Sequence, residues 1–148
     1  MLKGIPAIIS PELLDVLMRM GHGDELVLAD ANFPSDTVAR ETVWGEAVSL
    51  TGAGTPEALA AVLKLLPLDE AVSRPAAIMA APPELGPQPI HNRLRAALAA
   101  EGCAEGQLEP LDRFDFYARA REAFAVVRTG ETAKYGNILI KKGVVSGC

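Results

Sequence analysis

The sequence predicts an α/β protein built as a single layered domain, with a central sheet flanked by helices. Three observations support this fold class. Segments with helical spacing alternate along the chain with short apolar segments typical of strands. The length, 148 residues, is that of one ordinary domain. Hydrophobic residues make up 49% and charged residues 22%, which is close to the globular average. We therefore expect one domain over residues 1–148.

The first half of the chain predicts two helices and a strand. Residues 10–12 (Ser-Pro-Glu) are typical of a helix start, with a capping serine, a proline in the first turn and an acid beside the helix N-terminus. We expect this helix to end near Gly21. Residues 25–30 (ELVLAD) predict a short buried strand. Residues 55–57 (Thr-Pro-Glu) begin a second helix by the same logic, and Pro67 ends it.

The second half continues the alternation. It predicts strands at residues 75–81, 124–128 and 137–141, a helix over 90–100, and another helix capped by Asp112. Residues 82–89 form a loop rich in proline and glycine. Residues 43–44 and 47–50 are apolar but too short to assign from the sequence.

Composition excludes several function classes. The net charge is −5 and no stripe of Lys and Arg occurs, so we expect neither a nucleic-acid partner nor attraction to an anionic membrane. No segment approaches the roughly 18 apolar residues that span a bilayer. The N-terminal apolar patch is broken by prolines, unlike a signal peptide. Cys103 and Cys148 lack metal-site or disulfide spacing, which favours a reduced, cytoplasmic protein.

His22 lies between two glycines just after the first expected helix. One interpretation is a solvated residue, or one that caps the helix end. The other is an acid–base group, because an imidazole exchanges protons near neutral pH and flanking glycines let a substrate approach. A metal site built from His22, Asp24 and Asp30 is a weaker alternative, and we expect no bound metal.

Asp30 ends the strand ELVLAD, at the carboxyl end where open α/β sheets place their ligands. A carboxylate after such an apolar run needs hydrogen bonds or a cleft edge, because an unpaired buried charge is very costly. A second polar group, Arg113, Tyr135 and Asn137, lies near the C-terminus. Fixed donors and acceptors with aromatic faces suit a neutral polyhydroxylated ligand. A plain tight turn at residues 135–136 is the alternative, and Tyr117 stays open between core and site.

Two long motifs carry a resemblance over nearly the whole chain: ISPELLDVLMRMGHGDELVLADANFP at residues 9–34 and LDRFDFYARAREAFAVVRTGETAKYGNILIKKG at residues 111–143. With them the sequence resembles the RbsD/FucU family of sugar mutarotases, and most of all the branch that acts on L-fucose. The resemblance implies an RbsD-like α/β fold and interconversion of the α and β anomers of L-fucose. D-ribose as the substrate, or sugar binding without catalysis, are the alternatives.

The resemblance also implies site residues and an assembly. It makes His22 the proton-transferring residue, and it assigns sugar binding to Asp30, Arg113, Tyr135, Gly136 and Asn137. Asn32 stands where some members of that branch carry histidine. Anomer exchange involves no redox change, so no cofactor is expected. Family members form ring-shaped homo-oligomers, commonly decamers, in which a neighbouring subunit completes the site, and we expect the same here.

Overall fold

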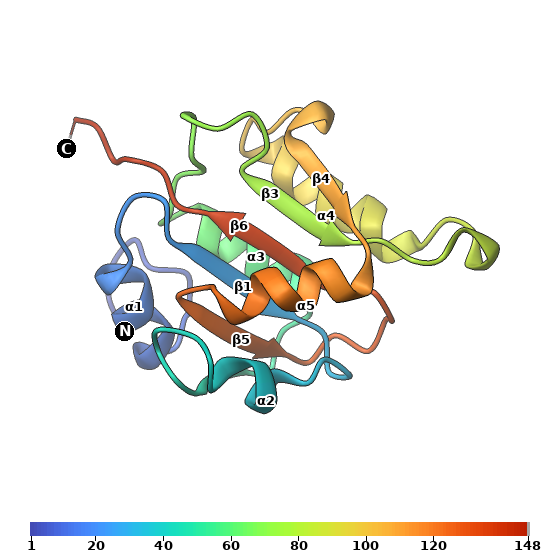
Figure 1. The fold of residues 1–148 in the computed structure, drawn as a ribbon. Coiled ribbons are helices and arrows are strands. Elements are labelled where there is room, and N and C mark those ends of the chain that lie inside the picture. Colours follow the sequence, from blue (N-terminus) through green and yellow to red (C-terminus); the bar gives the residue numbers. More distant parts are fainter. Residues whose placement is uncertain (148) are drawn as a thin grey trace.

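A six-stranded mixed sheet runs through the structure, a computed structural model that describes residues 1–147 (Figure 1). Its strands are β1 (Glu25–Ala29), β2 (Ala47–Leu50), β3 (Ala76–Met79), β4 (Leu108–Leu111), β5 (Ala125–Thr129) and β6 (Ile138–Lys141). Their spatial order is β2-β5-β1-β6-β3-β4. β6 is antiparallel to its neighbours β1 and β3, and the other pairs are parallel. The carboxyl ends of β1 to β5 therefore share one edge of the sheet with the start of β6.

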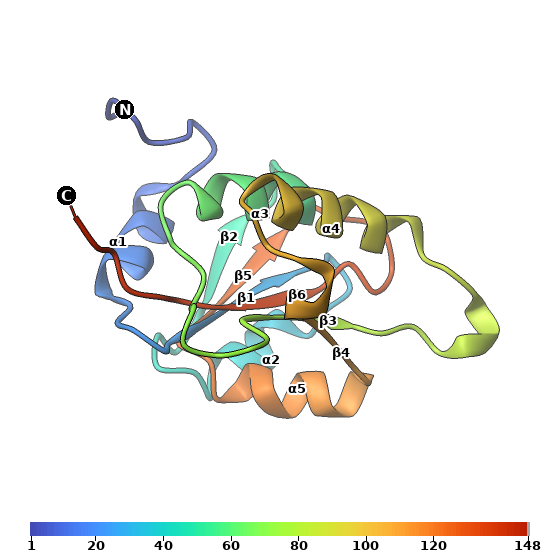
Figure 2. The same ribbon diagram turned by 90° about the horizontal axis from the view of Figure 1, so that it is seen from above.

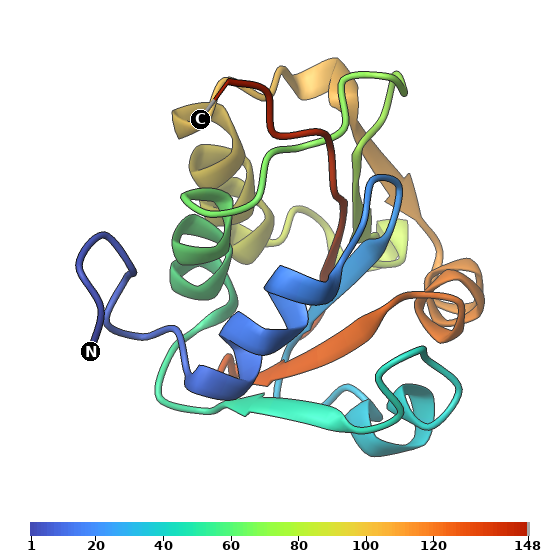
Figure 3. The same ribbon diagram turned by 90° about the vertical axis from the view of Figure 1, so that its left-hand side faces the viewer.

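Helices cover both faces of this sheet, which gives three layers (Figures 2 and 3). On one side lie α1 (Pro11–Arg19), α3 (Thr55–Leu63) and α4 (Pro89–Ala100), and on the other lie α2 (Ser35–Ala39) and α5 (Arg113–Arg121). Successive side chains of a strand point to opposite faces. On β1, Leu26 and Leu28 accordingly join the core under α1 and α3, while Val27 and Ala29 join the core under α5.

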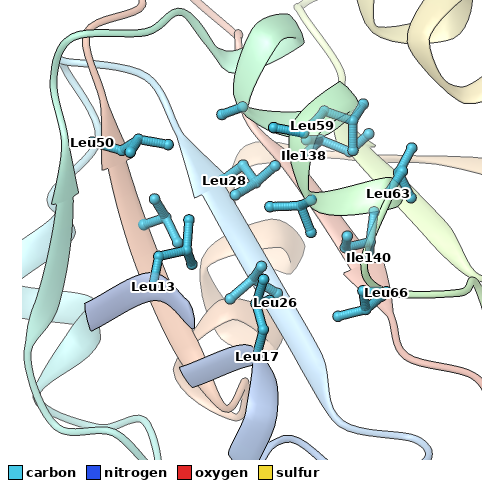
Figure 4. Close-up of a cluster of buried hydrophobic side chains, with 14 of the residues drawn as sticks. Leu13, Leu17, Leu26, Leu28, Leu50, Leu59, Leu63, Leu66, Ile138 and Ile140 are labelled. Carbon is cyan, nitrogen blue, oxygen red and sulfur yellow. The ribbon is translucent and has the colours of Figure 1, made fainter. Parts of the chain in front are cut away.

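The larger core explains why these segments fold as they do (Figure 4). Leucines at helical spacing on α1 and α3 meet the branched side chains of β1 and β6, and the fully buried ones include Leu13, Leu26, Leu28, Leu59, Ile138 and Ile140. Burying one such side chain contributes about 1.5–3 kcal/mol. The smaller core on the other face centres on Phe116, whose ring meets that of Phe33 edge-on at 6.1 Å.

The α/β prediction is confirmed, and most elements lie where the sequence indicates. Ser10 caps α1, and Asp112 caps α5 by accepting from the amides of residues 114 and 115. α1 ends one residue earlier than expected, because its C-cap is Met20, which is already extended, and not Gly21.

Two short elements, α2 and β4, were not expected from the sequence. α2 has only five residues, too few to show a helical period. β4 (LEPL) contains Pro110, which would break a central strand, but β4 lies at the edge of the sheet, where proline is tolerated.

β1 separates two groups of candidate site residues. The α1–β1 loop enters at one edge of the sheet, and the segment after β1 leaves at the opposite edge (Figure 1). Within residues 1–147 no helix is both long and apolar enough to cross a membrane.

Candidate active site

The Asp30 carboxylate is the centre of a buried hydrogen-bond cluster directly after β1. Oδ2 accepts from the Gly136 amide at 3.1 Å and from Asn137 Nδ2 at 3.0 Å, and Oδ1 accepts from the Asn32 amide at 2.9 Å. Asn137 Oδ1 in turn accepts from the Asp30 amide at 2.7 Å. Asp30 is 2% exposed and Asn137 3%. The cluster is therefore held from both sides and leaves little freedom to either side chain.

Burial sets the protonation behaviour of this carboxyl group. Loss of hydration raises the pKa of Asp30 above its ordinary value, while the hydrogen bonds from residues 32, 33, 136 and 137 oppose the shift. The net direction is upward. The Asp30 carboxylate thus depends on its donors to stay charged, which is the condition the sequence anticipated for an acid at the end of LVLA.

The pairing of β6 with β1 brings together residues 107 positions apart. Leu28 pairs with Ile138, and continuing this register sets Asn137 opposite Ala29 and Gly136 opposite Asp30. Gly136 is required here because a Cβ atom would lie 2.9 Å from Glu131 Cγ and 3.0 Å from the Ala133 carbonyl oxygen. Without a side chain, its amide reaches Asp30.

Tyr135 precedes this glycine in a left-handed conformation, with φ of 60°. It is the one residue other than glycine with positive φ within residues 1–147. Such a conformation costs about 1–3 kcal/mol and persists only where the surroundings determine it. The side chain of Tyr135 is half-buried against the core beneath α5. Strain of this kind clusters at functional sites, and the sugar-binding role expected of Tyr135 stays a prediction.

His22 lies at the other end of β1, in the α1–β1 loop. Its Nε2 is 3.0 Å from Asp69 Oδ1, and 51% of its side chain is exposed against 5% for Asp69. The amide of Ala71 donates to the same Asp69 oxygen at 3.0 Å. This bond, followed by that from His22, lowers the pKa of Asp69. A charged Asp69 accepts a hydrogen bond from Nε2 and leaves Nδ1 as the ring nitrogen free to exchange a proton.

The glycine after His22 serves the backbone. Gly23 has φ of +86°, which favours glycine, and a Cβ atom there would meet nothing within 4 Å. The Gly23 amide also donates to the Lys142 carbonyl at 2.8 Å, which ties the loop to the end of β6. Within this chain, space for a substrate is therefore not what makes Gly23 necessary.

One chain does not bring His22 and Asp30 together. The five residues of β1 separate them, and at about 3.3 Å per residue the strand alone spans roughly 17 Å. The alternative of a metal bound by His22, Asp24 and Asp30 is therefore wrong for a single chain. The structure gathers Asp30, Gly136 and Asn137 at one edge and places His22 with Asp69 at the other.

Arg113 and Tyr117 lie on α5, which starts where β4 ends, at the Asp30 edge of the sheet. The Arg113 side chain is exposed, with Cζ 4.9 Å from the ring centre of Phe114. Within the described chain it makes no hydrogen bond to Asp30 or Asn137. The ring of Tyr117 packs against that of Phe33 at 5.4 Å. Arg113 thus shares an edge with the Asp30 cluster without joining it.

Asp69 is a candidate site residue that the sequence did not reveal. It follows the apolar run LLPL, just as Asp30 follows LVLA, and both carboxylates are buried. An acid that ends an apolar run is therefore the signal that could have found it. Its partner His22 is 47 residues away, so no local spacing relates the two.

The two groups suit different chemistry. A fixed carboxylate with a neighbouring amide offers acceptors and donors to the hydroxyl groups of a small polar ligand. A half-exposed imidazole held by a charged carboxylate suits proton exchange with a bound molecule.

Comparison with known proteins supports this interpretation. The model of the RbsD / FucU transport protein family matches residues 3–145. Human fucose mutarotase is 50% identical over 98% of this chain and 95% of the human one. The crystal structure of the fucose mutarotase from Streptococcus pneumoniae in complex with L-fucose superposes with a TM-score of 0.90, at 42% identity over 97% of this chain and 99% of that one. Bacillus subtilis RbsD complexed with D-ribose gives a TM-score of 0.72 at 20% identity, covering 93% and 95%, which supports the fold alone.

Proposed function

The chain belongs to the RbsD/FucU family, and on that premise we propose that it acts as an L-fucose mutarotase, an isomerase that interconverts the α and β anomers of L-fucose. One observation carries the proposal. This protein is 42% identical to a fucose mutarotase whose structure contains L-fucose, and it holds a buried Asp30–Asn137 pair suited to binding sugar hydroxyls. The substrate is a monosaccharide, and neither nucleic acid nor membrane enters the proposal.

The reaction needs few groups. The anomeric hydroxyl loses a proton, the bond between C1 and the ring oxygen breaks, and the ring oxygen gains a proton. The open-chain aldehyde then turns its carbonyl face and closes by the reverse steps. Protons and electrons balance without an oxidant or reductant, so the chemistry requires no cofactor. A positioned acid–base group contributes about 10²–10⁴-fold to such a step.

We assign that acid–base role to His22. The Asp69 carboxylate accepts from Nε2 and so directs Nδ1 toward the sugar. Asp30, Asn137, the Gly136 backbone and Tyr135 would hold the hydroxyl groups, and Arg113 would approach from the start of α5. Alignment of the reacting oxygen with the imidazole supplies the remainder of the rate.

Because β1 separates His22 from Asp30, the proposed site needs two copies of the chain. His22 and Asp69 of one subunit would face the Asp30 cluster of its neighbour. Such head-to-tail contacts between unlike surfaces build a ring when the rotation between neighbouring subunits closes. We therefore propose a ring-shaped homo-oligomer, and the decamer and a cytoplasmic location stay predictions.

A mixing experiment tests the shared site. His22→Gln and Asp30→Asn each remove one half, and co-expression produces mixed oligomers. If each site spans two subunits and the two variants mix randomly in equal amounts, about one quarter of the sites would combine an intact His22 with an intact Asp30. We expect that fraction of the wild-type exchange rate. No recovery above the separate variants would show that each site lies within one chain.

Two other functions are separated by the substrate and the rate. Saturation-transfer NMR on the anomeric protons measures exchange for L-fucose and D-ribose directly. We expect the protein to increase the exchange rate of L-fucose more than that of D-ribose, since its similarity to the structure with bound D-ribose is limited to the fold. Faster exchange of D-ribose would make the chain a D-ribose mutarotase. Binding without acceleration would leave a non-catalytic sugar-binding protein.

A further inference from the structure

His91 contacts the Tyr135–Gly136 segment, which we propose binds the sugar. It belongs to α4, which covers the face of the sheet opposite to α5. It lies in the first turn of α4 and is 8% exposed, and its Nε2 is 3.0 Å from the carbonyl oxygen of Tyr135. A carbonyl oxygen can only accept, so this bond requires the hydrogen on Nε2. The neighbouring Ile90 packs against Gly136. A Cβ atom on Gly136 would lie 3.3 Å from Ile90 Cγ1. The first turn of α4 therefore covers residues 135 and 136 directly.

The two atoms held here belong to a single peptide group. The Tyr135 carbonyl accepts from His91, and the Gly136 amide of the same peptide donates to Asp30 Oδ2 at 3.1 Å. Any rotation of this peptide would break both hydrogen bonds at once. Because Tyr135 is left-handed, the peptide needs such restraint from its surroundings. His91 and Asp30 supply it from the two ends.

We propose that His91 is a positioning residue for sugar binding, which fixes the Tyr135–Gly136 peptide through the Tyr135 carbonyl and so sets the orientation of Tyr135 and Asn137. The inference rests on the proposed function, since it assigns His91 to the same sugar site. His91 does not touch the reacting atoms. Its loss should therefore weaken sugar binding and leave the proton transfer at His22 nearly unchanged.

Three substitutions and one control test the role. His91→Leu removes the donor and keeps much of the volume. His91→Gln can present an amide donor near the position of Nε2, whereas His91→Asn presents one nearer that of Nδ1 and falls short of the carbonyl. Asn92→Ala changes the adjacent, exposed position of the same helix. If the leucine variant does not fold, the comparison of Gln with Asn still decides.

The expected result separates KM from kcat. Losing one such hydrogen bond should raise the KM for L-fucose about three- to tenfold in the Leu and Asn variants, with kcat within about twofold of wild type. The Gln variant should recover most of the affinity, and Asn92→Ala should behave as wild type. A purely structural histidine would instead lower the melting temperature of all three variants without this split, and an unchanged KM in the Leu and Asn variants would overturn the proposal.

A second measurement does not depend on the substrate. Hydrogen exchange of the Gly136 amide reports whether the peptide is held, because this amide is protected by its bond to Asp30. We expect faster exchange at Gly136 in His91→Leu and near wild-type exchange in His91→Gln. If L-fucose proves not to be a substrate but Gly136 responds in this way, the function proposal fails while the structural part of the inference stands. Equal protection of Gly136 in all variants would refute it.

Discussion

The two ends of β1 present functional groups under opposite conditions. Asp30 is nearly fully buried and its two oxygens accept three hydrogen bonds, whereas half of the His22 side chain is exposed and one bond, to Asp69, orients it. A group that holds a ligand gains from rigidity, because ordering it on binding then costs little. A group that exchanges protons needs access to the reacting atom and to solvent. The difference matches the roles assigned to the two residues.

The comparison also explains the distribution of strain and stability. The residues around Asp30 include the left-handed Tyr135 and the crowded Gly136, so the fold maintains an unfavourable local conformation there. Beside His22, Gly23 has a positive φ, but a Cβ atom on it would meet no other atom within 4 Å. Substitutions at the Asp30 end should therefore affect folding and binding together, whereas substitution of the half-exposed His22 should affect mainly the rate.

The largest effect is expected from His22→Gln, which removes the imidazole at the exposed end of β1. We expect kcat for anomer exchange to fall by about 10²–10⁴-fold. The unfolding free energy should change by less than about 0.5 kcal/mol, as for other exposed positions. Saturation-transfer NMR and denaturant unfolding measure the two quantities. A wild-type rate in a folded variant would exclude His22 as the acid–base group.

Asp69→Asn should have the next largest effect, because it keeps the shape but removes the charge that orients His22. Loss of the charge on the hydrogen-bond acceptor of His22 should lower kcat about 10- to 100-fold. Glu70→Gln alters the adjacent exposed acid and is the matched control, with no expected change. If both variants lose activity equally, the effect comes from net charge at this edge and not from the bond to His22.

The pH dependence of stability gives an independent check on Asp69. Its pKa is lowered in the folded protein, so its charged form contributes stability above the ordinary carboxyl pKa of 3.8, and this contribution is lost as pH falls through the lowered pKa. The stability difference between wild type and Asp69→Asn should therefore shrink in acid. A difference that stays constant with pH would mean that the carboxylate is not specifically bound.

Local patterns predicted much of the fold, and they failed where the pattern was too short or the contact too distant. The caps at Ser10 and Asp112 and the apolar run of β1 are set by neighbours in sequence. The short helix α2 and the edge strand β4 offer no period to detect. Strand order decides which segments meet, and it depends on packing across the whole sheet.

The candidate site shows the same division. The sequence named Asp30 and Asn137, but only the pairing of β1 with β6 shows that they share two hydrogen bonds. Asp69 and His91 were missed, because each acts on a residue more than 40 positions away. The prediction for Arg113 remains a prediction, since within one chain it lies at the same edge without contacting the cluster.

The smallest effect is expected from protonation of Asp30, at the buried end of β1. Burial raises the pKa of Asp30, so acidification protonates this carboxyl group before ordinary ones. A protonated Asp30 is a weaker acceptor for the Gly136 amide and for Asn137, and L-fucose affinity should fall a few-fold, about as expected for one weakened hydrogen bond. Binding should be measured in the His22→Gln background, so that the measurement reports on the Asp30 end of the site.

The contribution of Asp30 to stability must move in the opposite direction from affinity, which makes the assignment to this residue specific. A folded pKa above the unfolded value means that the native protein binds more protons in this window, so the contribution of Asp30 titration to stability is fully present below pH 3.8 and is lost as pH rises through the folded pKa. Asp30→Asn removes the titrating group and should abolish this slope. If the loss of affinity on acidification persists in Asp30→Asn, or if the stability difference between wild type and Asp30→Asn does not change with pH, another carboxyl group is responsible. Asp30 would then no longer differ from His22 as the rigid partner of the site.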